Sequence, residues 1–197
     1  LSSSSAASDV YKRQGKPVPG HEVRIINENG ELIKEPGLDG EIIVKSDTPV
    51  SFLKYWENDK ATKQKVKDGW LYTGDFAYKD EEGYFYFKGR EDDIINTSGY
   101  RVGPSEVEDA ILSHPEVSMV AVIGIPDKLR GQIIKAFIVT GDRKNVLTQN
   151  DKLKQSIQSH VKLKLAAHEY PRLIEFVYEL PLTTTGKIIR KDLRENN

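Results

Sequence analysis

The strongest constraint on the fold is the segment at residues 88–104, where charged, glycine, proline, serine and asparagine residues surround the apolar pair Ile94 and Ile95. The segment follows a strand-like aromatic run at residues 84–87 and precedes a helix-start signal. A flexible linker would be polar throughout and would not carry two adjacent isoleucines. We therefore interpret the segment as a pivot that packs against protein on both sides, with glycines that allow close backbone approach to a ligand.

The residues before the pivot have a β-rich pattern. Strands are expected at residues 22–26, 40–45, 76–79 and 84–87, and a short charged helix at residues 60–67. Gly83 supplies the positive φ that a turn between the last two strands requires. This region is typical of the barrel-like end of a larger domain.

After the pivot, helix and strand patterns alternate. Ser105 and Glu108 have the spacing of a capping box, and residues 150–165 carry apolar positions four apart, as a helix requires. Strands are expected at residues 117–124, 133–140 and 173–177, the first two joined by a loop at residues 125–131. The alternation predicts a compact α+β domain, with the boundary to the β-rich region near Asp92.

Four motifs occur in one order along the chain. They are Tyr-Thr-Gly-Asp at residues 72–75, Gly-Arg-Glu-Asp-Asp at 89–93, Ser-Gly-Tyr-Arg-Val-Gly-Pro at 98–104 and Thr-Thr-Gly-Lys-Ile at 184–188. In these motifs the chain resembles the adenylate-forming enzymes, and within them the AMP-forming acyl-CoA synthetases of the acetate to medium-chain type. One motif alone is a weak signal, whereas four in order are specific.

The resemblance implies a division of the chain. Residues 15–91 would be the C-terminal part of the AMP-binding large domain. Residues 92–197 would form a small, mobile α+β domain with a short sheet flanked by helices. Residues 1–14 match nothing in the family and lack the apolar core of a signal peptide, so we expect a non-native leader or a disordered linker.

Two residues of the β-rich region are expected to bind the nucleotide. Taken alone, Asp75 is typical of a turn carboxylate that accepts from backbone amides, and Arg90 of a surface partner of Glu91 or Asp92. The resemblance implies instead that Asp75 accepts hydrogen bonds from the ribose hydroxyls of ATP, because a carboxylate offers two acceptor oxygens. Arg90 is implied to bind the same ribose or the adjoining phosphate through paired N–H donors.

Joining a carboxylate to the α-phosphate of ATP brings two anions together, so a cation must lie where charge develops. Lys187 follows Gly186 in a threonine-rich loop and matches the family's C-terminal lysine, and the resemblance implies that it is the catalytic cation. A solvated surface lysine is the alternative for such a residue in isolation. Mg²⁺ is expected to arrive with ATP, without ligands from this chain.

The second half-reaction transfers the acyl group to the thiol of CoA. The resemblance implies that the small domain rotates about Asp92 as a hinge, which withdraws Lys187 and presents a CoA-binding surface. The residues expected to contact CoA are Ser98, Gly99, Arg101 and Lys162.

Composition excludes several functional classes. The net charge of −1 gives no basic excess for nucleic acid, and no apolar run is long enough to span a membrane. The absence of cysteine excludes disulfides, thiol nucleophiles and cysteine-bound zinc. His160 and His168 are interpreted as structural, because no cluster of metal-ligand spacing surrounds them. We expect a cytoplasmic protein.

Other interpretations remain open within and outside the family. The chain could belong to an adenylation domain that loads a carrier protein, or to an aryl-CoA ligase, in which glutamine is usual at the position of Arg101. It could also be a non-catalytic nucleotide- or CoA-binding module. In the family, the phosphate loop, the adenine-binding segment and the acyl pocket lie upstream of these residues. The remainder of the large domain is therefore an expected partner, and these 197 residues alone are expected to lack synthetase activity.

Overall fold

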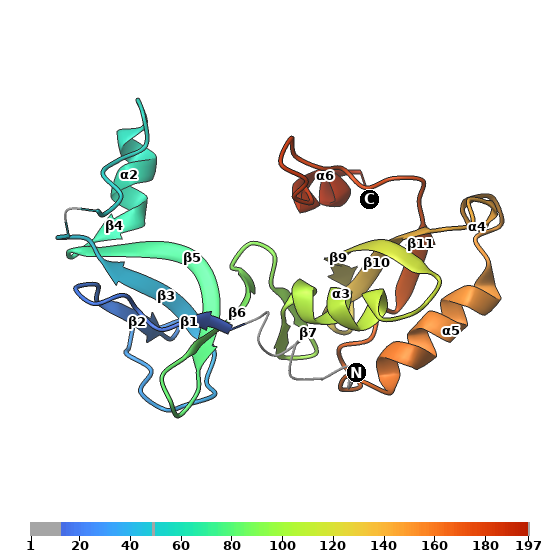
Figure 1. Cartoon of the computed structure of the whole chain (residues 1–197), viewed down its shortest axis with the longest axis horizontal. Helices are drawn as coiled ribbons and strands as arrows, with labels where there is room; N and C mark the ends of the chain where they lie inside the picture. The colour runs from blue at the N-terminus through green and yellow to red at the C-terminus, as the bar shows by residue number, and fades with distance from the viewer. Residues whose placement is uncertain (1–12, 49, 197) are drawn as a thin grey trace, which may run out of the picture. The chain divides into compact units, whose positions relative to one another are not determined.

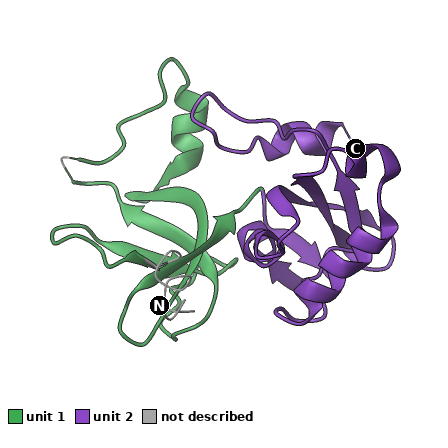
Figure 2. Cartoon of the chain, turned by 45° about the vertical axis from the view of Figure 1, so that its right-hand side comes forward, with its two compact units in different colours: residues 1–92 green, residues 93–197 purple. Residues whose placement is uncertain are grey.

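The computed structural model describes residues 13–48 and 50–196. The chain divides into two compact units, residues 1–92 (unit 1) and residues 93–197 (unit 2), as Figure 1 and Figure 2 show. Each unit has its own sheet and its own buried core.

The first ordered strand includes part of the segment that the sequence assigns to a leader. Residues 1–12 lie outside the described residues. Arg13 and Gln14 belong to strand β1 (Arg13–Gly15), which pairs antiparallel with strand β6 (Phe85–Arg90). The sheet of unit 1 therefore includes the last two residues of the predicted leader.

Unit 1 is an antiparallel sheet in the order β1-β6-β5-β3-β2, with β4 beside β5. Its remaining elements are β2 (Val23–Ile26), β3 (Gly40–Lys45), helix α2 (Asp59–Lys65), β4 (Val66–Lys67) and β5 (Trp70–Lys79). A small core of Ile25, Ala77 and Phe85 lies on one face. The predicted hairpin is confirmed: Gly83 has φ +83°, and Tyr78 pairs and stacks with Tyr86.

Unit 2 is built on a five-stranded sheet. Its elements are β7 (Ile95–Thr97), β8 (Tyr100–Val102), α3 (Pro104–Leu112), β9 (Val117–Asp127), β10 (Gly131–Thr140), α4 (Lys144–Thr148), α5 (Asp151–Lys162), β11 (Leu173–Phe176) and α6 (Arg190–Glu195). Strand β10 pairs antiparallel with β9 and parallel with β11, and it meets β7 at Gly131 and Thr97. The predicted α+β class is confirmed.

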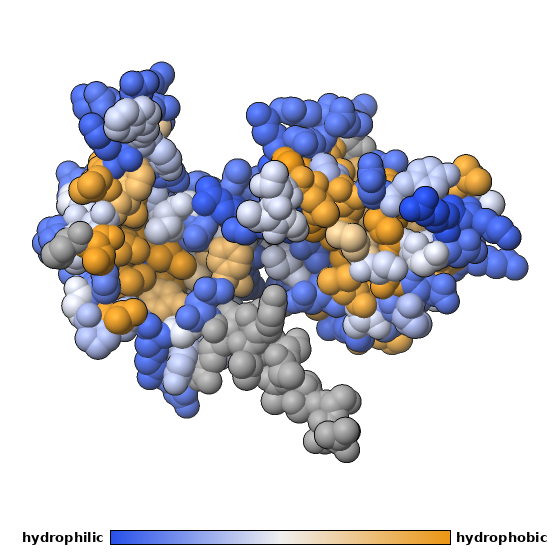
Figure 3. All heavy atoms as spheres, turned by 45° about the horizontal axis from the view of Figure 1, so that its top comes forward, coloured by the Kyte–Doolittle hydropathy of each residue, from blue (hydrophilic) through white to orange (hydrophobic). Residues whose placement is uncertain are grey.

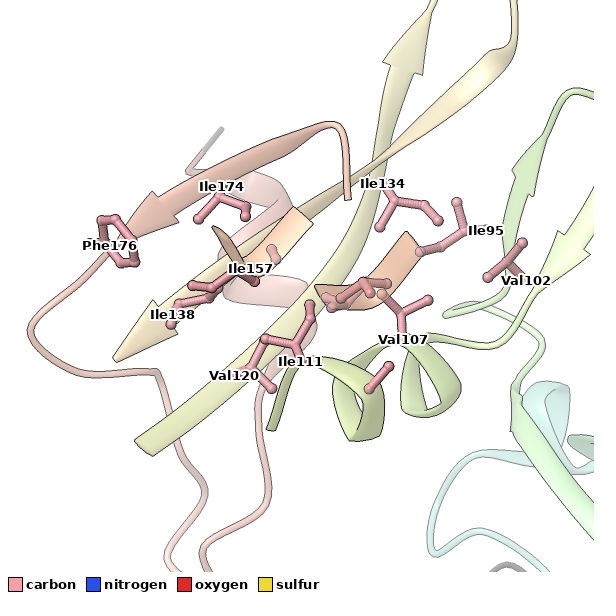
Figure 4. Close-up of a cluster of buried hydrophobic side chains, with 14 residues drawn as sticks. Ile95, Val102, Val107, Ile111, Val120, Ile134, Ile138, Ile157, Ile174 and Phe176 are labelled. Atoms are coloured by element: carbon pink, nitrogen blue, oxygen red, sulfur yellow. The ribbon is translucent and has the colours of Figure 1, made fainter. Parts of the chain in front are cut away.

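The sheet of unit 2 is buried on both faces. Along β9, Val120 and Val122 point to one face while Ala121 and Ile123 point to the other, as the two-residue period of a strand requires. The first face packs against α3 and α5 in the larger core, which Figure 4 shows. The second face is covered by the C-terminal segment, whose Leu180 completes a smaller core.

Three local predictions in unit 2 need correction. Helix α3 begins at Pro104 after Gly103, with no side-chain cap, so Ser105 and Glu108 do not form a capping box. Glu108 is buried and binds elsewhere. The predicted loop at residues 125–131 is largely strand, because β9 and β10 pair up to Gly131. The pivot also contains a hairpin, β7 and β8, that its polar composition hides.

On the face that Figure 3 shows, both units carry apolar areas between hydrophilic ones. In unit 1, Leu53 and Trp56 are 89% and 83% exposed. Large apolar side chains that gather on a surface mark contact with another protein segment. Among the described residues, no helix is long and apolar enough to cross a membrane.

Ile157 tests the larger core of unit 2. It is fully buried on α5, so Ile157→Ala should lower the free energy of unfolding of unit 2 by about 2–5 kcal/mol through lost contacts and a residual cavity. Urea unfolding followed by circular dichroism measures the change. Leu147→Ala, at a position on α4 that is 76% exposed, is the control and should change the free energy by less than about 0.5 kcal/mol. Equal losses would contradict this core assignment.

Candidate functional site

The structure brings Asp75 and Arg90 together as neighbours across strands β5 and β6. The Nη1 of Arg90 donates to Oδ1 of Asp75 at 3.2 Å, and its Nε donates to Oδ1 of Asp92 at 3.4 Å. The side chains of Arg90 and Asp75 are 50% and 38% exposed, so both can reach a ligand. Asp75, Arg90 and Asp92 therefore form one charged group on the surface of unit 1.

The turn that carries Asp75 is held by polar contacts that the sequence did not reveal. Thr73 donates its hydroxyl to the carbonyl of Ile42 and accepts from the N–H of Asp75. Glu41 accepts from the N–H of Gly74 at 3.0 Å. Gly74 has φ +75°, and a side chain there would meet Lys65 and Arg90. These contacts fix the direction of Asp75.

Neighbouring carboxylates keep Arg90 charged. Partial burial alone would lower the pKa of Arg90, but Asp75 and Asp92 outweigh it and raise that pKa above its ordinary value. The guanidinium is therefore a permanent cation in unit 1. Its charge is largely balanced by the two carboxylates beside it.

Two hollows lie next to these residues in unit 1. One of about 200 Å³ is lined by Asp75 together with Val23, Ile42, Phe85 and Phe87. The other, of about 430 Å³, is lined by residues that include Glu41, Lys65, Tyr72 and Glu91. The surface around the Asp75 turn is thus concave and carries charges of both signs, a setting in which ligands commonly bind.

Lys187 lies on a tight turn in unit 2. The N–H of Lys187 donates to the hydroxyl of Thr183, and its carbonyl accepts from the N–H of Thr183 at 2.8 Å. Gly186 closes the turn with φ +80°. The side chain of Lys187 is exposed, and no carboxylate within the described ranges pairs with its Nζ. The turn therefore presents an uncompensated cation on a fixed backbone.

The predicted CoA-binding residues of the pivot form the β7–β8 turn. Ser98 and Gly99 have φ +52° and +83°, and a side chain at Gly99 would meet nothing within 4 Å. Tyr100 is exposed and stacks on His168, with ring centroids 3.9 Å apart. Arg101 lies on β8 opposite Asn96. The turn therefore presents open backbone beside an aromatic pair.

Lys162, which is exposed, lies beside two half-buried residues of unit 2, Tyr170 and Arg172. Its Nζ lies 4.2 Å from the ring centre of Tyr170, and Arg172 donates to the hydroxyl of the same tyrosine at 2.9 Å. Tyr170 and Arg172 were not among the CoA-binding residues predicted from the sequence. The Tyr-Pro-Arg run at residues 170–172 was a usable sequence signal for a binding surface. With Lys162 it places an aromatic ring between two cations, which suits a phosphate-bearing ligand.

His160 takes part in a polar cluster of unit 2. Its Nε2 lies 2.8 Å from the hydroxyl of Ser113, which also accepts from Lys164 at 2.7 Å. Partial burial, Lys164 and His114 together lower the pKa of His160. The described residues contain no group of histidine, cysteine and acidic side chains able to hold a metal ion.

The lowered pKa of His160 predicts a loss of stability in acid. The unfolded chain takes up a proton on this histidine near pH 6.5, whereas the folded chain resists it. The unfolded state therefore binds more protons as the pH falls below about 6.5, and the free energy of unfolding decreases. Urea midpoints at pH 7.5 and 5.5 should differ less for His160→Gln, whose amide can still bind Ser113, than for the wild type. An unchanged pH dependence would exclude this role for His160.

Residues 106–187 match the family model of the AMP-binding enzyme C-terminal domain. The chain is 48% identical over 181 residues to YtcI, an uncharacterized acyl-CoA ligase of Bacillus subtilis (strain 168), covering 92% of this chain and 34% of that protein. It is 45% identical over 184 residues to the mitochondrial acyl-coenzyme A synthetase ACSM3 of Rattus norvegicus, covering 91% of this chain and 31% of that protein.

A solved structure extends the similarity to three dimensions. The crystal structure of the anthranilate CoA ligase AuaEII in complex with anthranoyl-AMP matches with a TM-score of 0.81 and 37% identity. The match covers 94% of this chain and 34% of that one. The chain thus spans about a third of the length of each relative, with 34% and 31% of the two proteins above covered.

Proposed function

Because this chain belongs to the adenylate-forming superfamily, we propose that it forms the C-terminal part of an AMP-forming acyl-CoA synthetase. Such an enzyme joins a carboxylic acid to ATP, giving acyl-AMP and pyrophosphate, and then transfers the acyl group to the thiol of CoA with release of AMP. Residues 15–91 would end the large AMP-binding domain, and residues 92–197 would form its mobile domain. The meeting of Asp75 and Arg90, which come from two separate motifs, carries the proposal.

In the first half-reaction, unit 1 holds the nucleotide and unit 2 supplies the cation. Asp75 accepts from the two ribose hydroxyls, and Arg90 orients Asp75 and donates to ribose or phosphate. Lys187 stabilises the charge that develops as the carboxylate oxygen attacks the α-phosphate. Its exposed Nζ on a fixed turn supports this role.

In the second half-reaction, rotation at Asp92 removes Lys187 and presents the CoA-binding surface. The open backbone of Ser98 and Gly99 leaves room for the pantetheine arm. Arg101 and Lys162 bind the phosphates of CoA. Tyr170, which contacts both Lys162 and Arg172, extends that surface toward Arg172.

The remaining elements of the proposal concern partners and location. The rest of the large domain covers the exposed apolar side chains of unit 1, among them Leu53 and Trp56. Mg²⁺ accompanies ATP and takes no ligand from this chain. We also propose a cytoplasmic location, in keeping with a chain that has no cysteine.

An aryl-CoA ligase is the second candidate. The similarity to the anthranilate CoA ligase AuaEII favours it, at 37% identity. The higher identity to an acyl-CoA ligase and to the acyl-coenzyme A synthetase ACSM3, at 48% and 45%, favours the acyl-CoA synthetase. Pyrophosphate exchange with a series of aliphatic and aromatic acids separates the two candidates.

Asp75→Ala in the full-length protein tests the nucleotide site. Without the carboxylate the ribose loses its acceptor, so the ATP concentration needed for half-maximal rate should rise and both half-reactions should weaken. Steady-state kinetics at varied ATP measure the effect. Asp80→Ala, on the turn between β5 and β6, is the control in the same unit and should leave the ATP dependence unchanged. An unchanged ATP dependence in Asp75→Ala would assign Asp75 to a purely structural turn.

Lys187 and Asp92 should affect opposite half-reactions. Lys187→Ala should slow adenylate formation, measured by pyrophosphate exchange, by on the order of 10² to 10³, as loss of one electrostatic stabiliser does. Transfer from supplied acyl-AMP to CoA should survive. Asp92→Pro locks φ and removes an N–H, so adenylate should form while acyl-CoA release fails. Equal impairment of both steps by both variants would refute the rotation.

A further inference from the structure

Arg190, the first residue of α6, binds two carboxylates from distant parts of unit 2. Its Nη2 donates to both oxygens of Glu108 on α3, at 2.8 and 2.7 Å. Its Nη1 donates to Asp93 at 3.4 Å, and Arg194 donates to the other oxygen of Asp93 at 2.8 Å. These four residues are called the α6 ion cluster below.

The α6 ion cluster is held in one geometry by burial. The side chains of Arg190, Glu108 and Asp93 are only 18%, 10% and 13% exposed. Glu108 also accepts from the N–H of Val122, which ties its carboxylate to β9. Removing the guanidinium would leave the buried carboxylate of Glu108 without a cation and Asp93 with Arg194 alone, which costs far more than loss of a surface ion pair.

Helix α6 is held by these contacts and by the smaller core. It has six residues, none of them buried, and an isolated helix of that length is unstable in water. Leu193 is partly buried and packs against the smaller core. The ion pairs of Arg190 and Arg194 attach α6 to α3 and to Asp93, the first residue of unit 2.

The same attachment holds the base of the Lys187 turn. The N–H of Ile189 donates to the carbonyl of Pro181 at 2.9 Å, and Leu182 forms a bridge with Ile188. Arg190 directly follows this closure. A displacement of Arg190 is therefore passed through Ile189 and Ile188 to the backbone of Lys187.

We propose that Arg190 is a positioning residue for Lys187 and that the α6 ion cluster joins the lysine turn to Asp93, the residue after the proposed hinge. The inference rests on the proposed function, in which Lys187 must reach the α-phosphate and later withdraw. Electrostatic stabilisation requires a charge held close to its target, and small misplacements cost large factors in rate. The cluster fixes the position of the Lys187 backbone relative to Asp93.

Hydrogen exchange tests the attachment independently of any activity. Arg190→Lys keeps a cation but cannot reach both carboxylates, so amides at residues 181–190 should exchange at least about tenfold faster while those of β9 and β10 are unchanged. Glu108→Gln, which still can accept from Val122, should give the same pattern. Lys191→Ala is the matched control, because Lys191 lies on α6 with its side chain 74% exposed and its ion pair is with Glu195 of the same helix. Unchanged exchange in the turn, or faster exchange throughout unit 2, overturns the inference.

A double-mutant cycle in the full-length protein tests the consequence for catalysis. Arg190→Lys should slow pyrophosphate exchange about 10- to 100-fold and spare acyl transfer from supplied acyl-AMP. In the Lys187→Ala background the same substitution should have little further effect, because Arg190 acts through Lys187. A full additional loss in that background, or equal loss in both half-reactions, shows a general structural role and overturns the inference. A wild-type protein that forms no acyl-AMP refutes the proposed function itself.

Discussion

Strand β10 is the constraint on which unit 2 depends. It pairs with β9 on one side and with β11 on the other, and its apolar side chains enter a core on each face. A strand buried on both faces has no solvent-facing side on which to place polar residues, so other elements must cover both. Helices α3 and α5 cover one face. The C-terminal segment covers the other, and this requirement brings the Lys187 turn and α6 back against the sheet.

Local sequence patterns predicted most of the helices and strands. They failed where a residue far away in the sequence determines what a side chain binds. The continuous apolar run of β9 and the glycine turn at Gly83 are local signals, and they predicted the strand and the hairpin. Glu108 had the spacing of a capping residue, but Arg190, 82 positions away, binds it instead. The β7–β8 hairpin was missed because its strands have only three residues each, too short for a period to emerge.

In the candidate site, too, residues in local motifs were predicted, whereas residues whose contacts depend on distant parts of the chain were not. Asp75, Arg90 and Lys187 stand in short motifs and were found from the sequence, and their roles remain proposals. Glu41 was not found, because its contact with Gly74 requires the pairing of β3 with β5. Tyr170 and Arg172 were missed for a similar reason, since their relation to Lys162 depends on how the chain returns after α5.

The distribution of charge suits a reaction in which one cation must leave. Arg90 lies between the carboxylates of Asp75 and Asp92, so its positive charge is compensated within unit 1. Lys187 has no such partner among the described residues and brings its whole charge. A cation fixed in unit 1 would stabilise the first transition state but would remain when the thiol of CoA attacks. In the proposed mechanism, a turn that moved with unit 2 would carry the uncompensated charge to the first step and withdraw it before the second.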